Sequence, residues 1–217
     1  MRRNCRKLVG VAAATLALEE PIFEFGSYDV GLQGDFADLR PFFPGKAYVG
    51  CDMRPGPGVD RVLDLHSLDL PDQSVGTVIC LDTIEHVEFP WQAMNEIWRV
   101  LAPHGTVILT SVMNFPIHNY PHDYWRFSPE AFRSLLKRFP RTWVGMAGRP
   151  DFPHTVAAIA CRSGEADLSS FAKEADVWAK RQRWEFEHVV EALMPPVLMP
   201  MTKAVGRVVY RALGRQV

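Results

Sequence analysis

A glycine turn and a downstream aspartate are the first residues in this sequence whose types and spacing could do chemistry. Residues 22–25 are apolar and β-prone, and they run into Gly26, where a chain leaving a buried strand can turn with its backbone bare. A second apolar stretch, 46–51, ends in Asp52. Asp52 lies about 25 residues downstream, close to the spacing at which nucleotide-binding α/β folds place a carboxylate on the ribose hydroxyls. The pair predicts an adenosine-containing ligand.

Histidines form a second group, because the pKa of imidazole suits proton transfer near neutral pH. His86 follows the fourth candidate strand, and His118, His122 and Asp123 lie in PIHNYPHDYWRF after the fifth. We take these four residues as candidate catalytic groups. The segment continues with residues that could stack on a ring or sugar and hydrogen-bond to it, namely Tyr124, Trp125 and Arg126. It is therefore predicted to be a substrate-binding lid, although Trp125 and Phe127 could equally anchor the loop to the core.

The elements that must position these residues alternate along the chain. Candidate strands lie at residues 22–25, 47–51, 61–65, 77–81, 106–111, 142–147 and 155–161. Several are continuously apolar, as strands covered on both faces should be. Helical patterns lie at 35–43, 91–101 and 129–139, and the last has Ser128 as a candidate N-cap before Pro129. This alternation predicts an α/β fold with a mostly parallel sheet.

Five motifs in succession carry a resemblance to a known family. FEFGSYDV, AYVGCDMRPGPG, RVLDLHSLDLPD, GTVICLDTIEHV and APHGTVILTS, in this order and spacing, resemble the motifs of class I S-adenosylmethionine-dependent methyltransferases, over residues 21–161. The family usually has ExGxGxG in the first motif. Here Glu24 and Gly26 are kept and Ser27 follows, which resembles an ExGS subgroup tied to sugar and cell-surface chemistry. The resemblance implies a doubly wound, mostly parallel seven-stranded sheet.

The resemblance also implies a cofactor, S-adenosyl-L-methionine, and the residues that hold it. Asp52 would accept both ribose hydroxyls, since a carboxylate is acceptor-only and can take two donors. Asp64 would accept from the adenine amine, Met53 would pack on the ring, and Asp82 would line the methionine side. Carried over by motif, the cofactor-binding positions are Glu24, Gly26, Ser27, Asp52, Met53, Asp64, Leu65, Leu81 and Asp82.

One further set, Asp82, Glu85 and His86, resembles the acidic and histidine residues with which ubiquinone-biosynthesis O-methyltransferases hold a divalent ion. Asp82 stands where that set has its first glutamate. Acidic residues also complement the dipole at the start of a helix. We expect the helix-start role and predict no metal ligands.

The two ends of the chain differ from its centre, and we expect a methyltransferase-like domain over 1–163 and a C-terminal helical extension over 164–217, packed on it. MRRNCRK followed by LVGVAAATLAL has the basic and apolar regions of a secretory signal, but we favour a helix packed beside the first strand. Residues 201–213 form a basic amphipathic pattern. Its basic face either is solvated on the parent domain or binds a membrane surface or a second copy.

Composition narrows the class of protein. The formal net charge of −1 over 217 residues provides no global basic field for nucleic acid. The four cysteines show no CxxC spacing, so we expect buried thiols in a reducing cytoplasm. No apolar run reaches the length of a membrane span.

Together these features predict a methyltransferase that methylates an oxygen, or less readily a nitrogen, of a small molecule or glycan precursor. Methyl transfer is an in-line displacement for which alignment supplies most of the catalysis, with a lid histidine as base. The alternative is a catalytically silent protein of the same fold, acting in assembly or regulation. A dehydrogenase is disfavoured, because Gly26, Gly31 and Gly34 do not supply the GxGxxG spacing.

Overall fold

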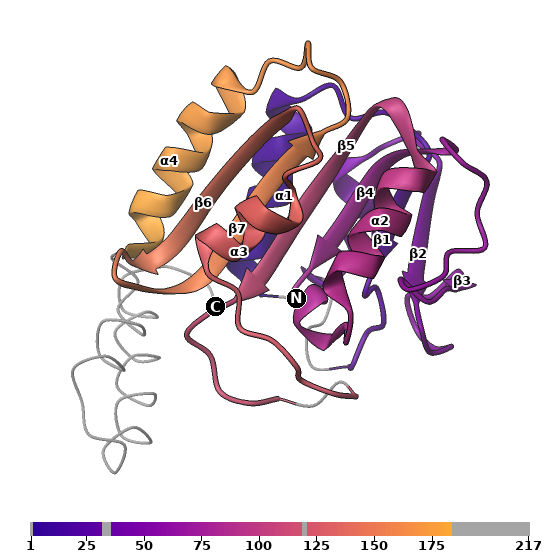
Figure 1. Cartoon of the computed structure of the whole chain (residues 1–217), viewed down its shortest axis with the longest axis horizontal. Coiled ribbons are helices and arrows are strands. Elements are labelled where there is room, and N and C mark those ends of the chain that lie inside the picture. Colours follow the sequence, from indigo (N-terminus) through magenta and orange to yellow (C-terminus); the bar gives the residue numbers. More distant parts are fainter. Residues whose placement is uncertain (1, 32–35, 119–120, 184–217) are drawn as a thin grey trace.

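The computed structural model describes residues 2–31, 36–118 and 121–183 as a seven-stranded sheet between two layers of helices (Figure 1). The strands are β1 (Ile22–Phe25), β2 (Tyr48–Asp52), β3 (Arg61–Val62), β4 (Val75–Leu81), β5 (Leu101–Val112), β6 (Arg141–Arg149) and β7 (Phe152–Cys161). The helices are α1 (Arg3–Thr15), α2 (Pro90–Val100), α3 (Pro129–Leu135) and α4 (Ser169–Arg183).

The sheet has the strand order β3-β2-β1-β4-β5-β7-β6. Strands β1 to β5 pair in parallel, and β7 runs antiparallel between β5 and β6. The chain order reverses at β1, which lies between β2 and β4. Ligands of open α/β sheets bind at such a reversal, beyond the carboxyl ends of the strands. The predicted fold class is confirmed, including the mostly parallel sheet.

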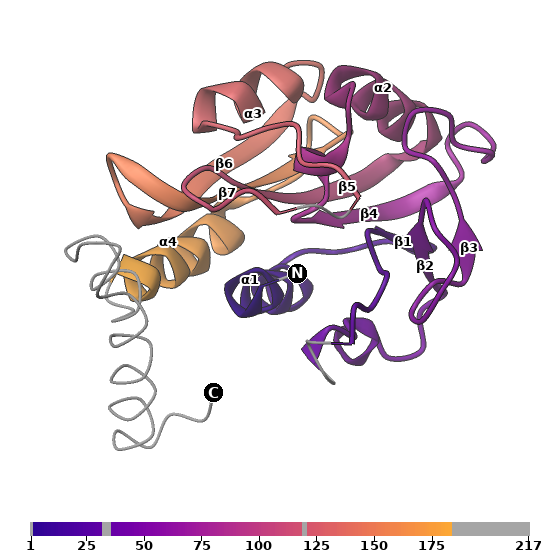
Figure 2. The ribbon, with the colours of Figure 1, turned by 90° about the horizontal axis from the view of Figure 1, so that it is seen from below.

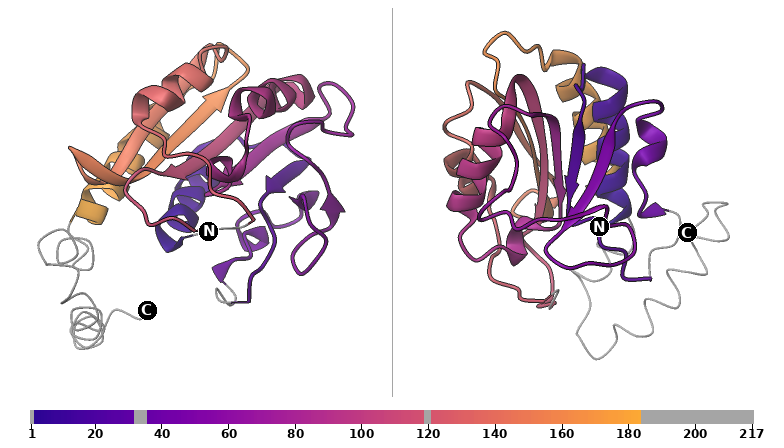
Figure 3. Two further views of the ribbon diagram at one scale, coloured as in Figure 1. Left: turned by 60° about the horizontal axis from the view of Figure 1, so that its bottom comes forward. Right: turned by 90° about the vertical axis from the view of Figure 1, so that its right-hand side faces the viewer.

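Helices α2 and α3 cover one face of the sheet, and α1 and α4 cover the other (Figure 2; Figure 3, right). Leu8 and Val9 of α1 are fully buried, in one cluster with Ile79 of β4 and Phe171 of α4. The indole N–H of Trp178 in α4 donates to the Asn4 carbonyl at 2.9 Å. The amino-terminal stretch is thus a helix packed on the sheet, and the apolar residues that resemble a secretory signal form part of this core.

The local signals explain where most elements begin and end. Pro90 begins α2 and Pro129 begins α3, where a missing N–H costs no hydrogen bond. The Ser128 hydroxyl accepts from the Ala131 N–H at 3.2 Å, so the predicted cap of α3 is confirmed. Strand β3 ends at Val62, three residues earlier than expected.

The helix predicted over 35–43 is wrong in its described part. Only a 3-10 turn, η2 (Arg40–Phe42), forms there, together with a short turn at Phe36. A helix over 35–43 would have Pro41 in its interior, where proline removes a hydrogen bond and clashes with the preceding turn, and Pro44 and Gly45 follow η2 directly. The described residues therefore place no α-helix between β1 and β2.

The structure describes only the first part of the predicted C-terminal extension, up to residue 183. Helix α4 packs on α1 and on β6, so the beginning of the expected extension belongs to the helical layer of the domain. The basic pattern at 201–213 lies outside the described residues. Within the described part, the four cysteines are buried free thiols, and no helix combines the length and apolarity needed to cross a membrane.

Candidate functional site

A cavity of about 600 Å³ lies at the carboxyl ends of the central strands. In Figure 1 the segment between β5 and α3 loops past the arrowheads of these strands. The predicted site residues that line the cavity are Gly26, Asp52, Met53, Asp64, Leu65, Asp82, His86, His118, His122 and Tyr124. The aspartates at the carboxyl ends of β2, β3 and β4 thus line one common cavity. The predicted residues outside the lining are Glu24, Ser27, Leu81, Asp123, Trp125 and Arg126.

Part of the cavity wall combines two carboxylates, Asp52 and Asp64, with apolar side chains, and we call this part the slot. The Asp52 side chain is 11% exposed, and its Oδ1 accepts from the Arg54 N–H at 3.0 Å. Asp64 is more open, at 56% side-chain exposure, and accepts from the backbone N–H of His66 at 2.9 Å. Met53 and Leu65 also line the cavity. The slot can therefore offer apolar contact and hydrogen-bond acceptors to the same ligand.

The turn after β1 requires glycine. Gly26 has φ of +85°, in the left-handed region, and a Cβ there would lie 2.0 Å from Oγ1 of Thr83. The turn can approach β4 only because that atom is missing. Ser27 follows, with its hydroxyl buried and without a hydrogen-bond partner among the described residues.

An ion pair after β4 lines another part of the cavity. Arg2 donates to Asp82 from Nη2 at 2.7 Å and from Nε at 3.0 Å, and its backbone N–H donates at 3.1 Å. Thr110 Oγ1 lies 3.1 Å from the same carboxylate. Burial opposes ionisation of Asp82, but Arg2 outweighs it and holds the pKa of that carboxyl below its ordinary range. Asp82 also has φ of +48°, rare for a residue other than glycine.

Arg2 is a cavity residue that sequence reasoning missed. Its carboxylate partner lies 80 positions away along the chain, and no local pattern joins them. Arg2 also donates to the hydroxyl of Thr155 in β7 at 2.7 Å. The tightly held guanidinium therefore depends on the packing of α1 across the sheet.

The side chains of two predicted cofactor residues are buried in the sheet and do not line the cavity. Glu24 is buried in β1, where its Oε2 accepts from the Tyr48 hydroxyl at 2.7 Å. Burial raises the pKa of Glu24 to about 7. Leu81 is 3% exposed and packs in the cluster with α1 and α4. Neither side chain reaches the cavity in this structure.

The lid is a tightly bonded loop. The Glu85 carbonyl accepts from the backbone N–H groups of Tyr124 at 2.9 Å and Trp125 at 3.1 Å. Arg126 pairs with both oxygens of Asp123, at 2.5 Å and 2.7 Å. These bonds hold the pKa of Asp123 below its ordinary range, and its side chain is 1% exposed. Asp123 is thus a poor proton acceptor, and the geometry shows it orienting His118 through the backbone N–H at 2.7 Å.

The outer edge of the lid carries an aromatic cluster. Trp91 contacts Phe89 and Trp125 edge to face, at ring centroid distances of 5.8 Å and 6.1 Å. All three rings are partly exposed, beside Val87 of the cavity wall. Trp125 also donates from Nε1 to the Val87 carbonyl at 3.0 Å, and its ring lies 6.3 Å from that of buried Phe127. These contacts give Trp125 and Phe127 the anchoring role that the sequence left open.

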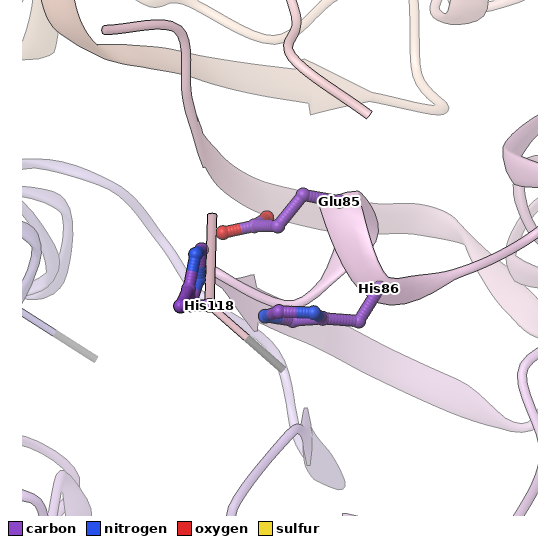
Figure 4. Close-up of side chains that lie close together, drawn as sticks. All are labelled: Glu85, His86 and His118. Atoms are coloured by element: carbon purple, nitrogen blue, oxygen red, sulfur yellow. The ribbon is translucent and has the colours of Figure 1, made fainter. Parts of the chain in front are cut away.

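Three titratable side chains meet where the lid crosses η3 (Ile84–His86), as Figure 4 shows. Potential ligand atoms of Glu85, His86 and His118 all lie within 4.8 Å of one another. Burial, together with the neighbouring charge of Asp82, raises the pKa of Glu85 to about 8. Burial lowers the pKa of His86. The set suggested by the sequence is different, because Arg2 engages Asp82 and His118 takes its place.

Comparisons with known proteins relate this architecture to that of methyltransferases. A family model described as a methyltransferase domain matches residues 48–109. A methyltransferase from Burkholderia thailandensis, solved with 1,6-didemethyltoxoflavin and S-adenosylhomocysteine, superposes with a TM-score of 0.56 at 14% identity, covering 74% of this chain and 79% of that one. The fold is that of S-adenosylmethionine-dependent methyltransferases.

Further solved structures give the same result. An S-adenosylmethionine-dependent methyltransferase from Archaeoglobus fulgidus has a TM-score of 0.54 at 14% identity, over 72% of this chain and 94% of that one. One from Thermotoga maritima has a TM-score of 0.50 at 19% identity, over 73% and 92%. No curated protein gives a significant sequence match. At these identities the likeness establishes the methyltransferase fold and leaves the acceptor to be argued from the site.

Glu24→Gln should remove a pH dependence of stability from this methyltransferase fold. Because burial raises the pKa of native Glu24 from 4.5 to about 7, its contribution is full below pH 4.5 and is lost as the pH rises through 7. The amide can keep the bond from Tyr48 but cannot ionise. Between pH 5 and pH 8 the wild type should therefore lose about 2 kcal/mol more unfolding free energy than the variant loses.

Urea denaturation at a series of pH values measures this difference. Glu19→Gln, an exposed neighbour, is the matched control and should follow the wild-type profile. Parallel profiles for Glu24→Gln and the wild type would contradict the buried, protonated glutamate.

Proposed function

We propose that this chain is an S-adenosylmethionine-dependent methyltransferase acting on an oxygen, or less readily a nitrogen, of a small molecule or glycan precursor. The observation that carries the proposal is that Asp52, Asp64 and Asp82, from the carboxyl ends of β2, β3 and β4, line one cavity in a methyltransferase fold. An aspartate after a strand is often only a turn residue. Three that share a cavity match the spread of polar groups on an adenosyl amino acid.

The nucleoside end of the cofactor is assigned to the slot between Asp52 and Asp64. Asp52 has acceptor capacity beyond its bond from Arg54, since a carboxylate accepts about four hydrogen bonds. It would take the two ribose hydroxyls. Met53 and Leu65 would contact the adenine faces, and Asp64 would accept from the exocyclic amine.

The methionine end is assigned to Arg2 and Asp82. The amino-acid group of the cofactor is a zwitterion, so its site needs a cation for the carboxylate and an acceptor for the ammonium. Arg2 and Asp82 present both charges at one end of the cavity, beside the bare backbone of Gly26. The sulfonium would then lie between this pair and the lid, with its methyl group toward the acceptor.

Proton removal from the acceptor is assigned to a lid histidine. His118 and His122 both line the cavity, and Asp123 orients His118. A carboxylate behind an imidazole fixes the tautomer and stabilises the charged ring. Tyr124 lines the same wall and would contact the acceptor. The predicted substrate contacts of Trp125 and Arg126 remain predictions, because the described cavity does not include them.

A second candidate is a catalytically silent protein of this fold. The Arg2–Asp82 pair favours it, because the two side chains already satisfy each other at the end where the methionine group would bind. Glu24 of the first motif is likewise engaged, by Tyr48. Cofactor binding separates the two candidates.

S-adenosylhomocysteine should stabilise the wild-type chain. At a hundredfold excess over Kd, ligand linkage contributes about 2.7 kcal/mol, which raises Tm by about 5–10 °C for a chain of this size. Asp52→Ala should weaken binding about 100-fold or more, since both ribose bonds are lost. Calorimetric titration and thermal unfolding measure both effects. Asp151→Ala on the β6–β7 turn is the control and should bind as the wild type does. Absence of any shift at saturating ligand would favour the silent protein.

Arg2→Gln should discriminate between two ligands that differ only in the amino-acid group. S-adenosylhomocysteine carries that group, and 5′-methylthioadenosine lacks it. The variant should lose about 10- to 100-fold in affinity for the first and less than about twofold for the second. Asp52→Ala should weaken both. Both ligands are titrated into the same folded protein, so general damage affects them equally. Equal losses would remove Arg2 from the methionine end, and Arg2→Lys, which keeps the charge, should retain part of the preference.

Exchange of the base should lower kcat and leave cofactor affinity unchanged. Loss of a general base typically costs roughly 10²- to 10⁴-fold in rate. His118→Gln and His122→Gln are compared by the release of S-adenosylhomocysteine with a panel of acceptors bearing hydroxyl or amine groups. Wild-type activity in both variants would exclude both histidines as bases.

A further inference from the structure

We propose that Glu85, His86 and His118 form a binding site for a divalent transition-metal ion such as Zn²⁺ in the wall of the cavity. Glu85 and His86 come from η3, and His118 comes from the lid. Figure 4 shows the Glu85 carboxylate and the His86 ring both directed toward His118. Two imidazoles and one carboxylate, with a fourth position open, are a recurrent catalytic zinc set.

The spacing of the three groups suits a site that closes on its ion. Their ligand atoms lie within 4.8 Å of one another, and the two imidazole centroids are 4.8 Å apart with the rings at 80°. Ligands of a tetrahedral zinc are about 3.4 Å apart, from bond lengths near 2.1 Å. Side-chain movements that displace each ligand atom by about 1 Å would bring the three atoms to that distance.

Outer contacts already orient both rings for metal binding. Nδ1 of His86 contacts the His122 carbonyl. Nδ1 of His118 lies 3.1 Å from the Pro116 carbonyl and 3.2 Å from Asp123 Oδ2. When Nδ1–H donates to such an acceptor, the lone pair is on Nε2, and this is the arrangement that surrounds most metal-binding histidines. Asp123 is fixed in turn by Arg126.

The burial of Glu85 supports a bound cation independently of the spacing of the three groups. It is completely buried, its Oε2 accepts from the Ser111 hydroxyl at 2.8 Å, and its Oε1 has no hydrogen-bond partner among the described residues. A buried polar atom without a partner destabilises the folded protein. A cation between Oε1 and the two rings would satisfy it.

The donor set selects the class of ion. Imidazole suits Zn²⁺ and related transition metals, whereas Mg²⁺ requires oxygen ligands in octahedral geometry. Asp82 is excluded from the set, because its two oxygens already accept from Arg2 and Thr110. The site therefore differs from the Asp82, Glu85 and His86 set in the ligand that the lid supplies.

The role of the ion rests on the proposed function, although its binding does not. His86 and His118 line the cavity, so the open position would face the acceptor. An ion there polarises a bound hydroxyl and lowers its pKa. Because His118 is then a ligand, the proton acceptor is His122.

Titration of the full chain with Zn²⁺, in chelator-treated buffer without cofactor, tests the site. One equivalent should bind with Kd of about 1 µM or tighter, and Mg²⁺ should not compete. His118→Ala and His86→Ala should each weaken binding about 100-fold. Glu85→Gln, which keeps the volume and an acceptor for Ser111, should also weaken it by at least tenfold.

His104→Ala, at an exposed position outside the cavity lining, is the control for adventitious surface binding and should leave the affinity unchanged. Circular dichroism confirms that each variant is folded. Zinc binding that is absent in the wild type, or equally tight in His118→Ala and Glu85→Gln, would overturn the proposal. Titration of S-adenosylhomocysteine in the presence of chelator tests the proposed function separately, so either proposal can fail alone.

Discussion

The ion pair between Arg2 and Asp82 joins the amino-terminal helix to the end of β4, and the shape of the cavity depends on it. Two side-chain bonds and one backbone bond from Arg2 reach the same carboxylate. The pair lies among partners that satisfy it, with Thr155 on the guanidinium and Thr110 on the carboxylate. A buried ion pair contributes little net stability against an apolar substitute, but breaking it strands a charge. Its main effect here is to fix one arrangement of α1, β4 and β7.

The ion pair also holds α1 on a face of the sheet that the described connections between β1, β2 and β3 do not cover with an α-helix. The described residues between β1 and β2, and those between β2 and β3, contain no α-helix. One face of the sheet would be left open at that point. Helices from the two ends of the domain, α1 and α4, cover it instead and share a core with Ile22, Ile79 and Ile108. The amino terminus is thereby brought to the carboxyl edge of the sheet, where a ligand of this fold would bind.

The lid adds a second charge pair, Arg126 with Asp123. Arg126 and Asp123 brace a loop that otherwise holds to the domain through backbone bonds to Glu85 and side-chain bonds to Val87. The brace fixes His118 over η3, which brings two histidines and a buried glutamate together. The cavity lining therefore combines the carboxylates of Asp52, Asp64 and Asp82 with the imidazoles of His86, His118 and His122. This combination suits a cofactor held by hydrogen bonds beside an acceptor that gives up a proton.

The sequence by itself determined the strands of the sheet, their succession along the chain and the carboxylates at the ends of β2, β3 and β4. These follow from local patterns, since apolar runs, proline positions and caps depend on nearby residues. Only the tertiary structure decided that Arg2 pairs with Asp82 in the cavity wall, that Glu24 bonds to Tyr48 outside the cavity lining, and that His118 rather than Asp82 joins Glu85 and His86. Each of these depends on contacts between residues that are distant in sequence, formed when whole elements pack. Packing across the sheet has no short-range signature, and this is why a single sequence predicts which elements form more reliably than which side chains meet.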